Sequence, residues 1–226
     1  MTSAYAPKLV VTWSGGSATF YPDAHPESTS VDGLVGTYNR YEYWANILTK
    51  AGNAAYDAVF AVTCTSFKSA DISGGSQYWA QLYRGIFLFD TSSLDDGITI
   101  TGASLSLYGY AKEDNLETNI DVNIYTSSPV SDTGLVAADF GSLGSTPLCD
   151  TPITYANWSL TGYNDFVFNN DGITVISKTG ITYLGTRSAT HDAGGVEPNF
   201  MDESRSMLQC YSADYVSPTK PQVMIF

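Results

Sequence analysis

The chain has 226 residues, of which 43% are hydrophobic, 13% aromatic and only 15% charged, and this length suits one large β domain spanning 1–226. Ten basic against 23 acidic residues give a formal net charge of −13. Such a field repels phosphate backbones and anionic lipids, so we expect no nucleic-acid partner. The sequence has no apolar run long enough to cross a bilayer, so we expect no membrane insertion.

The first elements are short runs of β-branched and aromatic residues between clusters of Gly, Pro, Asp and Ser, a spacing typical of sandwiches. Pro7–Trp13 predicts a strand, and Ala18–Tyr21 predicts a second, shorter one. Pro22–Asp32, which contains two prolines, predicts a loop. Gly33–Thr37 and Tyr43–Leu48 both predict extended chain.

The middle of the chain holds its most apolar segment. Asp57–Ser66 has strong β character, and Ser69–Ser76 predicts a loop. Tyr78–Asp90 ends in the run Ile-Phe-Leu-Phe, and a continuous apolar run of this length predicts a central strand covered on both faces.

A turn and an alternating strand follow this apolar segment. Asp90 is expected to accept hydrogen bonds from the backbone N–H groups that follow it, as in an Asx turn. Ile98–Tyr108 alternates apolar and polar residues, with a shift of phase at Gly102 that predicts a β-bulge. Leu105 is therefore expected to point into the core.

The second half is predicted to be strands joined by loops, with one helix. Thr126–Pro152 and Thr190–Asn199 are rich in turn residues and predict loops. Asp171–Thr179 predicts a helix capped by Asp171 and ended by Gly180. The predicted strands are Ile120–Tyr125, one or two within Trp158–Asn169, Ile181–Arg187, Met207–Tyr211 and Gln222–Phe226. Many short strands with at most one or two short helices predict an all-β domain.

The segments Arg84–Leu94 and Ile98–Tyr108 resemble the DNRLRE-type domain family, whose consensus has an Arg, an aliphatic strand, Phe-Asp, a Ser-Ser-Leu turn and an Ile-x-x-Ala-x-Leu-x-Leu strand. Pro221–Phe226 resembles the closing strand of that family. The resemblance implies a jelly-roll-like antiparallel β-sandwich, as in carbohydrate-binding modules. The whole chain is also similar to uncharacterised phage and environmental structural proteins.

Catalytic motifs are absent from the sequence. It has no Gly-x-Ser-x-Gly, no His-Glu-x-x-His, no Walker A and no Gly-x-Gly-x-x-Gly. His25 and His191 lie in predicted loops, where surface positions are expected. We therefore expect a protein that is not an enzyme.

The three cysteines, Cys64, Cys149 and Cys210, are odd in number and far apart in the sequence. This spacing predicts neither a disulfide framework nor a zinc site, and it favours three reduced thiols. One disulfide with one free thiol is the alternative.

Acidic loop residues offer weak metal candidates. Asp90, Asp95 and Asp96 carry the oxygen ligands that calcium prefers, although no EF-hand pattern is present. Asp90 is more simply explained by its turn, so no cofactor is expected and calcium is kept as the alternative.

Two aromatic clusters are the best binding signal, because sugar rings stack on exposed aromatic rings and protein interfaces are rich in Tyr, Trp and Arg. The alternative is that the rings simply fill the core. The clusters comprise Tyr38, Arg40, Tyr41, Tyr43 and Trp44, and Tyr78 with Trp79.

These observations favour a non-enzymatic structural or assembly protein, such as a capsid decoration, a fibre or tail protein, or a surface filament subunit. Its expected partners are copies of itself in a homo-oligomer, other virion proteins and possible glycans. Residues 1–32 form a candidate arm that packs on a neighbouring subunit, and the strand Pro7–Trp13 is expected to add to the neighbour's sheet by β-augmentation. Met1–Pro7 does not resemble a secretory signal. Either a signal has been removed or the protein leaves its cell without one, as phage structural proteins do on lysis, so the expected location is the virion or the extracellular space. The alternative is a carbohydrate-binding module of a secreted protein.

Overall fold

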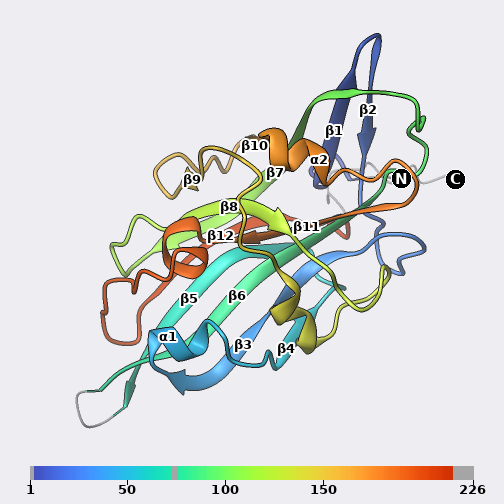
Figure 1. The fold of residues 1–226 in the computed structure, drawn as a ribbon. Coiled ribbons are helices and arrows are strands. Elements are labelled where there is room, and N and C mark those ends of the chain that lie inside the picture. The colour runs from blue at the N-terminus through green and yellow to red at the C-terminus, as the bar shows by residue number, and fades with distance from the viewer. Residues whose placement is uncertain (1–2, 73–75, 216–226) are drawn as a thin grey trace, which may run out of the picture.

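The computed structural model describes residues 3–72 and 76–215, which form a strongly curled half-barrel sheet of mostly antiparallel strands with only short helices (Figure 1). The all-β prediction is thereby confirmed. The strands are β1 Lys8–Trp13, β2 Gly16–Phe20, β3 Asp32–Glu42, β4 Ala54–Tyr56, β5 Ala61–Ile72, β6 Ser76–Asp90, β7 Ile100–Asp114, β8 Asp121–Thr126, β9 Ile153–Thr154, β10 Tyr163–Val167, β11 Ile181–Arg187 and β12 Arg205–Tyr211. The short helices are α1 Trp44–Ile47, α2 Asn170–Thr174, a 3₁₀ turn at Ala137–Ser142 and a π-helical turn at Ala189–Ala193.

The strands follow the order β2-β1-β7-β12-β5-β6-β11-β8-β9, with β10 on β7, β3 on β6 and β4 on β3. The two longest strands, β6 and β7, each exchange partners along their length. β6 pairs with β5 through its first part and with β11 through its last part. β7 pairs with β1 and β10 near its start and with β12 near its end. This exchange accompanies the curl of the sheet seen in Figure 1.

The core lies along β6 and β7, as the apolar patterns predict. The four residues Ile86, Phe87, Leu88 and Phe89 are all fully buried, so β6 is covered on both faces. Leu105 of β7 is also fully buried and lies in register with β1 on one side and β10 on the other.

The turn and bulge predicted between these strands are confirmed. Ser92 N donates to Asp90 Oδ1 at 3.0 Å, which is the expected Asx turn. Thr12 pairs with Gly102, whereas the next residue, Trp13, pairs with Ile100, so β7 carries an extra residue beside Gly102.

Two predictions of local structure were wrong around β3 and β5. Tyr43–Leu48 is not extended, because Trp44 and Ile47, three residues apart, both turn into the core from the single turn of α1. Ser69–Ser76 is mostly strand, because β5 continues to Ile72 and pairs with the beginning of β6.

Two further predictions were wrong near the second helix and the second histidine. α2 covers only Asn170–Thr174, and Asn169 rather than Asp171 caps it, since its side chain accepts from Gly172 N at 2.9 Å. His191 is buried rather than on the surface, because its ring packs against Phe67 and its Nδ1 lies 2.8 Å from a backbone carbonyl.

The predicted strand Gln222–Phe226 lies outside the described residues. All three cysteines are buried free thiols. Among residues 3–72 and 76–215, no helix is long and apolar enough to span a membrane.

Candidate functional site

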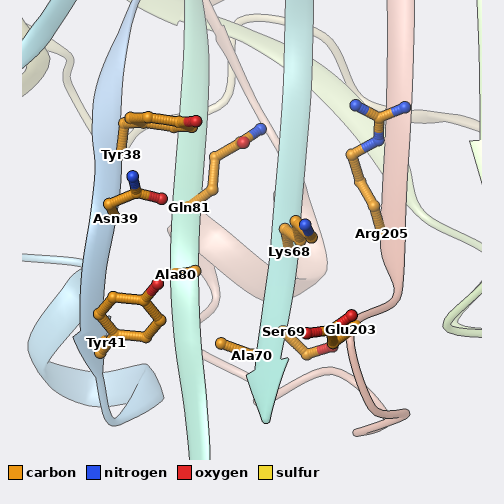
Figure 2. Close-up of a pocket in the computed structure, with 10 residues that line it drawn as sticks. All are labelled: Tyr38, Asn39, Tyr41, Lys68, Ser69, Ala70, Ala80, Gln81, Glu203 and Arg205. Carbon is orange, nitrogen blue, oxygen red and sulfur yellow. The ribbon is translucent and has the colours of Figure 1, made fainter. Parts of the chain in front are cut away.

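A hollow of about 310 Å³ opens on the solvent-facing side of the four neighbouring strands β3, β6, β5 and β12. We call it the four-strand hollow. Figure 2 shows the residues that line it, which come from all four strands and from the segment before β12. They are Tyr38, Asn39, Tyr41, Lys68, Ser69, Ala70, Ala80, Gln81, Glu203 and Arg205.

The hollow exists because small side chains lie between large ones. Ser69 and Ala70 of β5 and Ala80 of β6 are small and buried, so they leave space above the sheet. Tyr38 and Tyr41 rise from β3 on one side, while Glu203 and Arg205 stand on the other side (Figure 2). The result is a short trough across the strands, with aromatic rings along one side and charges along the other.

Irregular pairing surrounds Ala80 on both edges of β6. Toward β3, Tyr38 pairs with Gln81 and Glu42 pairs with Trp79, so three residues of β3 face Ala80 alone. Toward β5, Lys68 pairs with Gln81 and Ser69 pairs with Trp79. Ala80 therefore has no partner on β5 and is the bulged residue of β6. Such bulges redirect side chains and are frequent beside functional sites.

Left-handed backbone conformations also concentrate at the hollow. The described residues include five non-glycine residues with positive φ, and Asn39 (53°), Tyr41 (49°) and Glu203 (47°) all line it. Each such residue costs roughly 1–3 kcal/mol and persists only where the surrounding structure holds it. Part of that support comes from Asn53, whose side chain exchanges hydrogen bonds with the backbone N–H and carbonyl of Tyr38 at 2.8 and 2.9 Å.

The structure separates the aromatic candidates into exposed and buried groups. Tyr38 and Tyr41 line the hollow and are 50% and 46% exposed. Tyr43 is 54% exposed, and its ring centroid lies 4.9 Å from that of Tyr78. Tyr78 pairs with Ala70, which lines the hollow.

The two tryptophans and the arginine of the same clusters lie elsewhere. Trp44 and Trp79 are buried in the core, where their rings meet edge to face at 4.9 Å. Arg40 is partly buried, and its Nε has no hydrogen-bond partner. The tyrosines, rather than the tryptophans, are therefore the rings available to a ligand at this face.

Several lining residues carry no signal in the local sequence. Ser69 lies in a segment whose composition predicts a loop, and Lys68, Gln81 and Arg205 belong to no sequence cluster. Only the pairing of four strands distant in the sequence brings them together. Neither histidine lines the hollow, since His191 is buried in its turn and His25 contacts Glu27 at 2.9 Å.

The calcium candidates have other roles in the structure. Asp90 and Asp95 each accept a hydrogen bond from a backbone N–H two residues further on, at 3.0 and 2.7 Å, and the backbone carbonyl of Asp96 accepts from Lys178. Within the described part of the chain, no group of three or more His, Cys, Asp and Glu side chains is placed to hold a metal ion.

Comparison of the chain with models of protein families, with curated proteins and with solved structures found no match.

Proposed function

We propose that the chain is a non-enzymatic, glycan-binding module of a secreted or virion-surface protein, and that the four-strand hollow is its binding site. The observation that carries this proposal is the combination of two exposed tyrosines, Tyr38 and Tyr41, with polar side chains around one trough. Sugars present apolar C–H faces that stack on aromatic rings, and their hydroxyls exchange hydrogen bonds with amide and ammonium groups. The volume is at the small end of the range of about 300–1,000 Å³ for ligand pockets, which suits one or two sugar rings.

The backbone around the hollow supports this proposal. Sites built on strands hold their side chains more precisely than sites on loops, and a preorganised site loses less entropy on binding. The side chains of Ala80, Gln81 and Lys68 project from paired strands, and the bulge at Asn39–Tyr41 is held by Asn53. A rigid trough of this kind suits a ligand with a fixed ring shape.

The test is a screen of wild-type protein on a glycan array, followed by calorimetry on the glycans retained. We expect Tyr38→Ala and Tyr41→Ala each to weaken binding about tenfold, equivalent to ~1.4 kcal/mol. Tyr21→Ala is the matched control, because Tyr21 is also exposed and lies outside the hollow. A wild-type protein that retains no glycan, with or without calcium, contradicts the proposal.

We further propose that the curled sheet is a variant of the jelly-roll-like β-sandwich, as the DNRLRE-type resemblance implies. In support, β6 and β7 are long strands that pair with different strands at their two ends, as strands do when they pass from one layer to another. An experimental structure with two facing layers linked through β6 and β7 is the expected outcome.

A second candidate function, assembly into a homo-oligomer or onto other virion proteins, is favoured by the open edge of β2. Among the described residues β2 pairs with β1 alone, and the β1–β2 hairpin extends from the body in Figure 1. Natural proteins protect such edges with charges or proline, and Gly16–Phe20 contains neither. Both edges of β1 are occupied, by β2 and β7, so a neighbour joining residues 1–32 would pair with β2.

Sedimentation at increasing protein concentration tests this second candidate. We expect the wild-type protein to form a closed homo-oligomer and a Ser17→Lys/Thr19→Lys variant to stay monomeric, because charges on an edge oppose strand addition. Thr99→Lys, at an exposed position outside β2, is the control. A wild-type monomer at every concentration, with no purified particle that contains it, contradicts the assembly function.

A further inference from the structure

Four side chains at the upper end of the hollow form one row across the sheet. Tyr38 of β3 pairs with Gln81 of β6, Gln81 pairs with Lys68 of β5, and Lys68 pairs with Arg205 of β12. Neighbouring strands are about 4.8 Å apart, so the row spans roughly 14 Å. It presents, in order, an aromatic ring, an amide, an ammonium and a guanidinium (Figure 2).

Lys68 is exposed in the hollow, and within the described chain no hydrogen bond, ion pair or aromatic ring engages its ammonium. Arg40 also has no such partner among the described residues, but it is only partly exposed, does not line the hollow and lies near the charge of Glu42. The other described basic residues have hydrogen-bond, ion-pair or ring partners: Lys8, Lys50, Arg84, Lys112, Lys178, Arg187 and Arg205.

The cross-strand neighbour of Lys68 is Arg205, which is also a cation. The folded protein therefore places a second positive charge beside an ammonium that has no partner. Like charges placed opposite each other on paired strands are destabilising. Arg205 is balanced by Glu113, which accepts from its Nε at 3.0 Å and its Nη2 at 2.5 Å, but Lys68 is not balanced. The net charge of −13 repels extended polyanions, but an uncompensated cation in a trough is a local attractor for a single anionic group.

We infer that the ligand of the four-strand hollow is an acidic glycan. Its carboxylate or sulfate group binds at Lys68 beside Arg205, and its ring lies toward Gln81 and Tyr38. The carboxylate of Glu203, at the other end of the charged side, repels an acidic group and so favours this orientation. The inference rests on the proposed glycan-binding function and adds the chemical class of the ligand.

The test compares acidic oligosaccharides of one or two rings with neutral partners that lack the charge. Short uronates are paired with their methyl esters, and short sulfated galactans with their desulfated forms, so that the two arms distinguish a carboxylate from a sulfate. We expect wild-type protein to bind at least one acidic form about tenfold or more tightly than its neutral partner, with affinity falling as salt rises.

Two variants connect this preference to Lys68. Lys68→Met is expected to abolish the preference for the acidic form, whereas Lys68→Arg retains the preference. Lys50→Met is the matched control, since it removes the same charge from an exposed lysine outside the hollow.

The outcomes separate the two proposals. Equal binding of acidic and neutral forms, unchanged in Lys68→Met, overturns the acidic-glycan inference and leaves the glycan-binding function in place. Failure of every glycan in both arms to bind the wild-type protein overturns both.

Discussion

The guanidinium of Arg84 donates two hydrogen bonds of 2.7 Å to the carboxylate of Asp192, and both side chains are buried. The same carboxylate accepts from Arg187 at 2.7 Å. Arg84 also donates to the backbone carbonyls of Phe140 at 2.6 Å and Leu48 at 3.1 Å. One buried ionic cluster therefore connects β6, β11, the 3₁₀ turn, the π-helical turn and the end of α1.

Removal of the charge on Asp192 should strongly destabilise the protein. Breaking a buried ion pair leaves an uncompensated charge, which costs about 3–5 kcal/mol, and here Asp192→Asn leaves Arg84 and Arg187 facing each other. Urea unfolding measures the loss, and Asp165→Asn, at an exposed position, should change stability by less than about 0.5 kcal/mol. Equal urea midpoints for Asp192→Asn and Asp165→Asn would show that the buried ionic cluster contributes nothing to the free energy of unfolding.

The same cluster predicts a loss of stability in acid. Burial acts to raise the pKa of Asp192, but the charges and hydrogen bonds of Arg84 and Arg187 outweigh it, so the pKa lies below the ordinary value of 3.8. Burial also lowers the pKa of Arg84, but a guanidinium stays protonated. The stabilisation is therefore present above the ordinary carboxyl pKa and is lost as pH falls through the lowered value.

Asp32 should have the opposite pH dependence. It is fully buried, and burial raises its pKa well above 3.8, with the charges of Asp214 and Glu27 adding to the shift. The native state therefore holds a proton that the unfolded chain has released. The stability that this proton contributes is complete below the unfolded pKa and is lost as pH rises through the folded pKa.

Asp32→Asn tests this sign, because an amide can still accept from Ala213 N, which lies 3.1 and 3.3 Å from the two carboxylate oxygens. Its melting temperature should exceed that of the wild type at about pH 8, and the difference should shrink toward about pH 4. The melting temperatures of wild type, Asp32→Asn and the exposed control Asp165→Asn are measured across this range. A difference in melting temperature between Asp32→Asn and wild type that stays constant with pH would mean that Asp32 does not titrate as described.

Local sequence patterns predicted the scaffold and pointed to Tyr38 and Tyr41 of the hollow, but not to the other strands that line it. The apolar run of β6 and the bulge at Gly102 were predictable because alternation and its interruption are properties of consecutive residues. The row Tyr38–Gln81–Lys68–Arg205 depends on which strands pair and in which register, information that no single segment contains. The small polar residues at the end of β5 predict a loop. A strand with one solvent-exposed face and small side chains has the same amino-acid composition as a turn, so composition alone does not separate the two.

Leu105→Asp tests the predicted inward face of β7. Leu105 is fully buried and lies in register between Leu9 and Phe166, so an aspartate there would be an unpaired charge in the core. We expect a loss of at least about 4 kcal/mol, enough to prevent cooperative folding. Soluble expression and thermal melts measure the effect, with Thr99→Asp at an exposed position as the control. A cooperative melt near that of the wild type would refute the assignment.

The sulfur atoms of Cys64 and Cys210 lie 3.4 Å apart on the paired strands β5 and β12. Burial raises the pKa of Cys210 well above its usual value, so little thiolate is present and oxidation should be slow in the folded state. A diazene oxidant such as diamide, which accepts two electrons and two protons, should join the two sulfurs. The disulfide would close a loop between positions 146 apart, and loops of this order stabilise by about 4–5 kcal/mol.

Peptide mapping by mass spectrometry after diamide treatment should find Cys64 joined to Cys210, with Cys149 still a free thiol that is alkylated once the protein is unfolded. Cys149→Ser should form the same disulfide, whereas Cys64→Ser should form none, because Cys149 lies away from the pair, near the loop before α2. Urea unfolding of the oxidised and reduced wild-type protein then measures the stabilisation. Alkylation of all three thiols after prolonged treatment, or a mixture of pairings, would show that the two sulfurs do not meet in solution.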